Sequence, residues 1–191
     1  MELILDFAKR LLKEHIRPDS TCADFTMGNG YDTLFLAQQA FEGQVYSFDI
    51  QPQALEHTKA LLEQHGIQNV QLILDSHSHL KQYISAPLDG AVFNLGYLPN
   101  GDKTITTQTD STLTAVQDAL SLLSDQGILV VVLYPGHAEG AKEAECLETY
   151  FRSLNGSKYD VIRYDFINKN HPPYLIAVQK RTPASRKNHE K

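Results

Sequence analysis

A glycine-containing segment near the N-terminus combines residue types that could bind a ligand. Residues 24–33 read DFTMGNGYDT and follow an apolar stretch that is typical of a strand. Gly28 and Gly30 permit turns and a close backbone approach that a Cβ would block. In α/β proteins the first strand-to-helix turn commonly holds the ligand. We therefore predict a ligand-binding loop here, and a tight turn without a ligand is the alternative.

The same loop argues against a dinucleotide. The dinucleotide fingerprint has a third small residue three positions after the second glycine, and Thr33 stands there instead. Asp32 would also bring a negative charge close to a pyrophosphate. A carboxylate at this place suits a ligand that carries an ammonium or a sulfonium. An NAD-binding oxidoreductase is kept as an alternative class.

Polar residues also follow the next two predicted strands. Asp49 comes about 20 residues after the loop, where a carboxylate can accept both hydroxyls of an adenosine ribose. Ile50 could cover an adenine face, and Gln51 offers an amide. Residues 75–77 (DSH) end the third strand and could reach the edge of a purine. These strand ends predict nucleoside binding, and an N-cap for a helix starting at Pro52 is the alternative for Asp49.

The fourth predicted strand ends in Asn94, with Tyr97 shortly after it. The Asn94 side-chain oxygen can accept a hydrogen bond from an amine and so orient its lone pair. Tyr97 can stack on a planar base. The alternative is that Asn94 satisfies the local backbone and that Tyr97 packs in the core.

Short apolar strands alternate with amphipathic helices along most of the chain, which predicts βαβ units and a parallel sheet. The predicted strands are 21–25, 44–50, 70–75, 88–94 and 128–134. The predicted helices are 2–16, 32–41, 52–65, 77–84, 106–124 and 139–153.

The end of the chain breaks this alternation. Residues 159–167 and 174–180 both have strand character, and the loop 168–173 between them is too short for a helix. These two strands must therefore pair antiparallel. We predict a single α/β domain over residues 1–191, with a basic tail from about 181. Its sheet should have seven mainly parallel strands that end in a C-terminal antiparallel hairpin, with helices on both faces.

Composition limits the function classes. The 191 residues carry a net charge of −6, which disfavours nucleic-acid binding by bulk electrostatics. The two cysteines indicate a reduced compartment, and a cytoplasmic location is expected. No apolar run reaches the roughly 20 residues of a membrane span, and the N-terminus does not read as a secretory signal.

Five motifs together resemble a known family over essentially the whole chain. They are residues 24–33, 75–77, 94–102 (NLGYLPNGD), 134–137 (YPGH) and 168–173 (NKNHPP). In this order they resemble class I S-adenosylmethionine (SAM)-dependent methyltransferases with a Rossmann-like fold. More narrowly, they resemble the putative rRNA methylase family, also called the MnmM or YtqB-type tRNA wobble-uridine methyltransferases.

The resemblance implies methyl transfer from SAM to the exocyclic primary amine of 5-aminomethyl-2-thiouridine at the tRNA wobble position. We assign Asn94 to orienting that amine and Tyr97 to stacking on the uracil. No catalytic base is identified. The resemblance also implies a homodimer. The residues expected to bind SAM are Asp24, Met27, Gly28, Asn29, Gly30, Asp32, Thr33, Asp49, Ile50, Gln51, Asp75, Ser76 and His77.

Four basic residues are candidates to contact the tRNA anticodon arm, with ordinary surface charge as the alternative for each: Lys103, Arg163, Lys169 and His171. Four histidines, at positions 77, 79, 137 and 171, invite a metal interpretation, but no H-E-x-x-H motif or cysteine cluster supports one. Two other functions stay open: methylation of rRNA or a small amine, and a non-catalytic RNA-binding factor with a nucleoside pocket.

Overall fold

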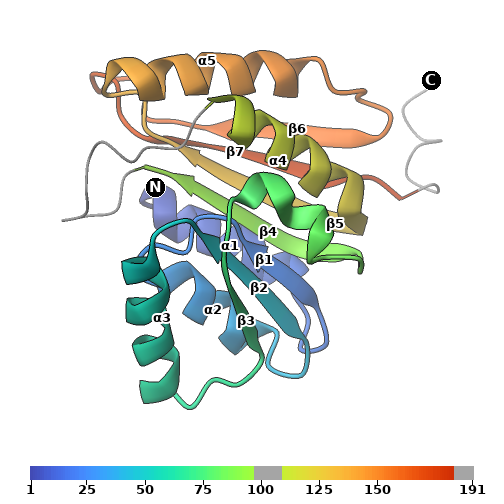
Figure 1. The fold of residues 1–191 in the computed structure, drawn as a ribbon. Helices are drawn as coiled ribbons and strands as arrows, with labels where there is room; N and C mark the ends of the chain where they lie inside the picture. The colour runs from blue at the N-terminus through green and yellow to red at the C-terminus, as the bar shows by residue number, and fades with distance from the viewer. Residues whose placement is uncertain (97–108, 183–191) are drawn as a thin grey trace.

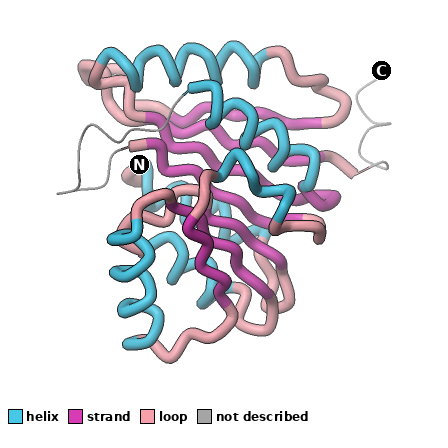
Figure 2. Tube along the Cα trace, in the orientation of Figure 1, coloured by secondary structure: helices cyan, strands magenta, loops and turns pink. Residues whose placement is uncertain are grey.

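The computed structural model describes residues 1–96 and 109–182. The assignments to Tyr97 and Lys103, and most of the basic tail, lie outside this range. The described residues form a seven-stranded sheet with helices on both faces (Figures 1 and 2). This is the architecture that the sequence predicts.

The sheet has the strand order β3-β2-β1-β4-β5-β7-β6. The first five strands run parallel, and β7 pairs antiparallel with both β5 and β6. The predicted C-terminal antiparallel hairpin is thus confirmed. The strands are β1 Thr21–Asp24, β2 Gln44–Asp49, β3 Val70–Leu74, β4 Leu88–Leu95, β5 Leu123–Leu133, β6 Tyr159–Tyr164 and β7 Tyr174–Lys180.

Two apolar layers attach the helices to the sheet. On one face, α1 buries an aliphatic stripe spaced at i, i+4, i+8 (Ile4, Ala8 and Leu12), and α2 adds Leu36 and Ala37. On the other face, η1, α4 and α5 cover a layer that includes four core phenylalanines. The helices are α1 Ile4–His15, α2 Tyr31–Gln39, α3 Pro52–Gln64, η1 His77–Gln82, α4 Thr109–Leu122 and α5 Ala138–Arg152.

Two elements differ from the prediction. Residues 77–82 form a 3₁₀ helix instead of an α-helix. Strand β5 begins at Leu123, directly after α4, because Leu123 pairs with Leu88 before a register shift in the ladder. Gln126, at φ 67°, lies within this irregular start. The sequence pattern misses it because Ser124 to Gln126 are polar and resemble a loop.

The strand order reverses between β1 and β4, which places a binding site at this edge of the sheet. Ligands of open α/β sheets bind where the strand order reverses, beyond the carboxyl ends of the strands. An aromatic layer supports this edge, with Phe25 stacked on Phe93 at 4.6 Å between ring centroids and tilted against Phe48 at 5.6 Å. These buried rings fix the strand ends that carry the predicted polar residues.

In the parts of the chain that the structure describes, none of the helices has the length and apolar character needed to cross a bilayer.

Candidate functional site

The glycine loop turns sharply between β1 and α2. Gly28 and Gly30 have φ angles of 52° and 81°, in the left-handed region, and Gly30 is the N-cap of α2. A Cβ on Gly30 would lie 2.6 Å from Thr58 Oγ1 on α3. The loop is tied to the next strand, because Met27 N donates to Phe48 O at 2.9 Å. This turn therefore requires glycine at position 30 for both conformation and space.

Asp49 connects the end of β2 to the glycine loop. Its Oδ2 accepts a hydrogen bond from Gly28 N at 3.0 Å, and its Oδ1 accepts one from Gln51 N at 2.9 Å. The N-cap of α3 is Gln51, so Asp49 is not the capping residue itself. Each carboxylate oxygen has a second lone pair, so Asp49 can still accept two ribose hydroxyls. Ile50 follows it and is 56% exposed, available to cover a flat ring.

Asp24 lies beneath the loop without any exposed surface. Its two oxygens accept hydrogen bonds from Thr26 N at 3.0 Å and from Thr33 Oγ1 at 2.7 Å. Burial raises the pKa of Asp24 to about 7, and the nearby Asp32 carboxylate adds to this shift. The Asp24 and Thr33 side chains are both fully buried and shape the loop from below, and their assignment to the cofactor site stays a prediction.

A row of hydrogen bonds crosses the carboxyl ends of β5 and β4 to reach α2. Tyr134 Oη donates to Asn94 Oδ1 at 2.9 Å, and Asn94 Nδ2 donates to Asp32 Oδ2 at 3.2 Å. The Asn94 backbone N–H donates to Thr26 Oγ1 at 2.8 Å, which joins this row to the glycine loop. Lys9 Nζ, on α1, lies 4.0 Å from Asp32 Oδ1. Amide and carboxylate groups thus meet beside the loop, where they can hold an amine.

The sequence pattern assigns no role to Tyr134, although this residue begins the YPGH motif at 134–137. It directly follows β5, at the same edge of the sheet as the end of β4. A polar aromatic residue at the end of a predicted central strand is the signal that could have identified it. Its partner is Asn94, 40 residues earlier in the chain, and no local pattern connects the two.

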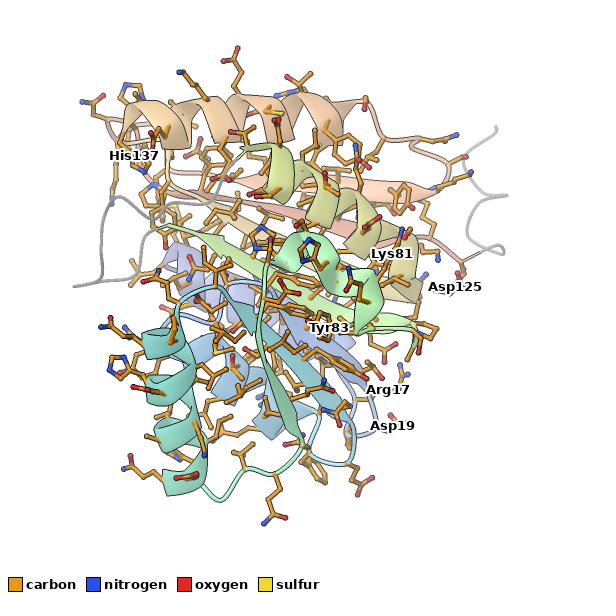
Figure 3. All side chains as sticks on the ribbon, in the orientation of Figure 1. Arg17, Asp19, Lys81, Tyr83, Asp125 and His137 are labelled. Atoms are coloured by element: carbon orange, nitrogen blue, oxygen red, sulfur yellow. The ribbon has the colours of Figure 1, made fainter. Side chains whose placement is uncertain are left out.

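The polar residues at the end of β3 bond to one another and to nearby residues in the chain. Asp75 Oδ1 accepts from Ser76 N at 2.7 Å and from His79 Nδ1 at 2.9 Å, and Asp75 Oδ2 accepts from Tyr83 Oη at 2.8 Å. These bonds lower the pKa of Asp75. Tyr83 lies just after η1 (Figure 3). His79 and Tyr83 therefore hold the carboxylate in place, and its expected contact with a purine stays a prediction.

His77 offers an unpaired acceptor next to the site. Its Nδ1 lies 3.0 Å from Phe25 O, so Nδ1 carries the proton and donates it to that carbonyl. Burial lowers the pKa of His77, which keeps the ring neutral. Among the described residues, Nε2 is buried and has no hydrogen-bond partner. This lone pair can accept a donor from a bound nucleoside or from water.

The histidines do not gather. His79 bonds to Asp75, and His137 caps α5 by accepting from Gly140 N at 3.1 Å (Figure 3). Within residues 1–96 and 109–182, we find no group of three His, Cys, Asp or Glu side chains that could hold a metal ion.

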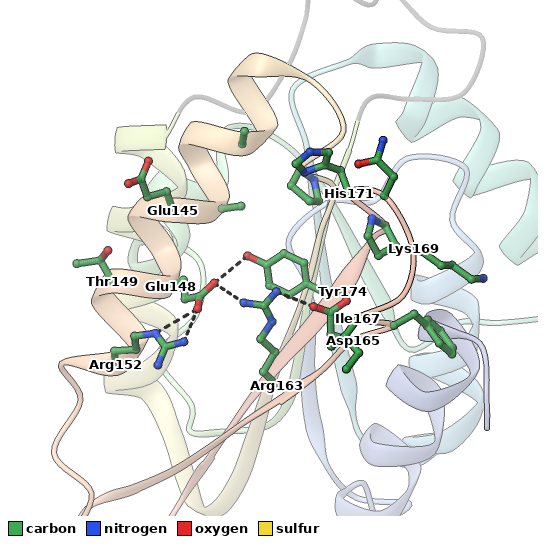
Figure 4. A pocket seen from close by; sticks show the side chains of 16 residues that line it. Glu145, Glu148, Thr149, Arg152, Arg163, Asp165, Ile167, Lys169, His171 and Tyr174 are labelled. Atoms are coloured by element: carbon green, nitrogen blue, oxygen red, sulfur yellow. Dashed lines mark hydrogen bonds and ion pairs between the residues drawn. The ribbon is translucent and has the colours of Figure 1, made fainter.

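A groove of about 680 Å³ lies between α5 and the loop that joins β6 to β7 (Figure 4). Arg163, which we expected to contact RNA, donates to Glu148 at 2.8 Å and to Asp165 at 2.6 Å. Its guanidinium also lies 4.1 Å from the ring centroid of Tyr174. Arg163 is therefore held in the wall of the groove by its protein partners. Lys169, on the opposite rim, makes no ion pair with any residue that the structure describes.

Comparison with known proteins gives close matches, among them the following three. A crystal structure from Clostridium thermocellum, described as a putative rRNA-methylase, is 37% identical with a TM-score of 0.92, covering 94% of this chain and 98% of the other. A putative methyltransferase from Streptococcus mutans in complex with SAH is 36% identical with a TM-score of 0.88, covering 94% and 99%. The Arabidopsis thaliana protein "tRNA (mnm(5)s(2)U34)-methyltransferase, chloroplastic" is 34% identical over 178 residues, which are 87% of this chain and 65% of that protein.

The sheet order, the glycine loop and these structural relatives define a class I methyltransferase that uses SAM. A family model described as "Putative rRNA methylase" matches residues 45–179, and the chain belongs to this family. The predicted family, fold class and cofactor are therefore confirmed.

The residues of this chain fit the cofactor. The left-handed turn at Gly28 and Gly30 shapes the loop beyond β1, Asp49 keeps free lone pairs for a ribose, and Asp32 provides a negative charge for a sulfonium or ammonium. The unpaired Nε2 of His77 adds a further acceptor.

Proposed function

We propose that this protein methylates the exocyclic primary amine of 5-aminomethyl-2-thiouridine at the tRNA wobble position, giving the 5-methylaminomethyl product. The observation that carries the proposal is the row Tyr134–Asn94–Asp32, which places an oriented amide oxygen and a carboxylate beside the glycine loop. The Arabidopsis relative is a tRNA methyltransferase by name, and it supports the choice of substrate. This chain spans 65% of that relative's length.

SAM supplies a methyl group on a sulfonium, a reactive electrophile. The main task of the protein is then to hold the amine nitrogen in line with that methyl, and such positioning can supply about 7–11 kcal/mol in favourable cases. Asn94 Oδ1 accepts one bond from Tyr134 and has a second lone pair to accept an N–H of the amine. This contact leaves the nitrogen lone pair free to point at the methyl.

Charge at the site favours the product side of the reaction. The nucleophile must be the neutral amine, and the nitrogen becomes positively charged as the new N–C bond forms. Asp32 already accepts from Asn94 Nδ2 and lies beside this point. Its fixed negative charge stabilises the developing positive charge. We assign Asn94 and Asp32 as the residues that receive the amine.

The groove between α5 and the β6–β7 loop is our candidate path for the RNA away from the methylated nucleotide. It extends from Pro135, next to Tyr134, and is bounded by Lys169 and His171 on the loop side (Figure 4). Because Arg163 is paired with two carboxylates, we assign the phosphate contacts in the described part of the chain to Lys169 and His171.

The test is a methyl-transfer assay with labelled SAM and tRNA from cells that lack this protein, followed by nucleoside mass spectrometry. We expect methylaminomethyl-thiouridine to form while its aminomethyl precursor disappears. Methylation of rRNA or of a small amine in its place, with tRNA unchanged, would refute the substrate and keep the cofactor site. SAM binding without transfer to any acceptor would support a non-catalytic RNA-binding factor.

A further inference from the structure

We infer that Tyr134 is a positioning residue for methyl transfer, acting on the amine through the side-chain amide of Asn94. This inference rests on the proposed function, because it concerns how the acceptor is held. The juxtaposition that carries it is the bond from Tyr134 Oη to Asn94 Oδ1 at 2.9 Å, made between residues on neighbouring strand ends.

The two partners of Asn94 determine which way its amide faces. The Asp32 carboxylate can only accept, so the atom that bonds to it at 3.2 Å must be the NH₂ group. The oxygen then faces Tyr134, whose hydroxyl donates. With Tyr134 and Asp32 at opposite ends of the amide, a reversed amide would lose the bond to Asp32 and set its oxygen against the carboxylate. The second lone pair of Oδ1 therefore keeps one direction.

The oxygen and the NH₂ group of an amide would have opposite effects on a nucleophilic amine. An amide oxygen accepts an N–H of the amine and leaves the nitrogen lone pair available. An NH₂ group in the same place would donate to that lone pair and block the reaction. The acceptor-only Asp32 carboxylate sets the orientation of the amide, and the donated bond from Tyr134 holds the oxygen in place. The role of Tyr134 is thus to maintain the amide orientation without touching the substrate.

Tyr134 is also suited to be a constant donor. Burial raises the pKa of its hydroxyl, and the charge of Asp32 raises it further. A phenol with its pKa raised above the ordinary value is protonated at neutral pH, so the donor of this bond is present there.

Steady-state methyl transfer with tRNA that carries 5-aminomethyl-2-thiouridine tests the inference. Tyr134→Phe should lower kcat about fivefold to tenfold, the usual range for one lost hydrogen bond, with KM for SAM unchanged. Tyr164→Phe is the matched control, since Tyr164 Oη is half-buried and makes one bond, to Glu2 O at 2.9 Å, away from the site. It should keep wild-type kcat. A kcat of Tyr134→Phe within twofold of wild type would overturn the inference.

A double-mutant cycle separates positioning through Asn94 from a general structural effect. If Tyr134 acts only through Asn94, Tyr134→Phe should have no further effect on kcat in an Asn94→Ala background. Independent, multiplying losses in the double variant would overturn the inference, because Tyr134 would then act by another route.

A second measurement does not depend on the substrate. In the full-length protein with SAH bound, the Asn94 side-chain amide signal is assigned by its loss in Asn94→Ala. Tyr134→Phe should speed solvent exchange of these amide protons severalfold, and Tyr164→Phe should not. Unchanged exchange in Tyr134→Phe would refute the inference. If the wild-type protein transfers no methyl group to tRNA, the proposed function is refuted. The exchange rate of the Asn94 amide protons would still show whether Tyr134 holds the amide.

Discussion

Replacing Gly30 by alanine should damage the SAM site through a clash that the structure locates. Gly30 has a φ of 81°, and a Cβ there would lie 2.6 Å from Thr58 Oγ1 and 2.8 Å from Thr58 Cγ2. A left-handed residue other than glycine costs about 1–2 kcal/mol. Overpacking adds about 1–3 kcal/mol. We therefore expect Gly30→Ala to lose about 2–5 kcal/mol of the free energy of unfolding, the sum of these two costs.

Gly66 provides the matched control for the backbone cost. It has a φ of 66°, and a Cβ on it would meet nothing within 4 Å. Gly66→Ala should thus lose only the conformational part, about 1–2 kcal/mol. Urea denaturation measures both variants. The difference between them isolates the contact with Thr58.

The same substitution should also reveal what the loop binds. If the loop moves to relieve the clash, the bond from Gly28 N to Asp49 Oδ2 is disturbed, and calorimetry should show SAM binding weakened by at least about tenfold. Gly66→Ala should bind SAM like wild type. Adding Thr58→Ala to Gly30→Ala removes both clashing atoms and should recover part of the affinity. Equal stability losses and normal SAM binding in both single variants would refute this account of the loop.

Three further predictions concern charges. The folded pKa of Asp24 is raised to about 7, above its unfolded value, so its contribution to stability is full below about pH 4 and is lost as pH rises to 7. Urea denaturation across about pH 4–8 should therefore show that Asp24→Asn reduces the decrease in the free energy of unfolding with pH. An unchanged pH dependence would contradict the burial argument. Lys169→Ala should raise KM for tRNA severalfold without changing SAM affinity. Lys142→Ala on α5 is the surface-charge control and should leave KM for tRNA unchanged. Equal KM values for the two variants would show that Lys169 does not contact the RNA. Glu148 accepts hydrogen bonds from Arg152, Arg163 and Tyr174. Glu148→Ala should therefore lower the free energy of unfolding by about 1–3 kcal/mol. A change in this free energy near zero would show that packing alone holds the groove wall.

Much of the site framework was predictable because it depends on local patterns. The alternation of apolar strands and amphipathic helices identified the parallel sheet, and the short loop at 168–173 required the antiparallel hairpin. Gly28 and Gly30 marked the turn after β1, and Asn94 marked the end of β4. Each of these signals lies within a few residues of the feature that it predicts.

Other features depend on partners that are distant in the chain. Arg163 looked like a free cation in the sequence, yet it pairs with Glu148 on α5 and stacks on Tyr174. A charge in the sequence carries no information on whether folding will neutralise it.

By itself, the sequence determined the fold class, most of the helices and strands, and the edge of the sheet at which the polar residues gather, because periodicity and turn chemistry act over short distances. The tertiary structure decided which of those residues face a ligand. It buried Asp24 beneath the loop and brought Tyr134 against Asn94 across 40 residues of chain. Burial and the contact between neighbouring strand ends arise only when the strands assemble in their order, and no local pattern encodes that order.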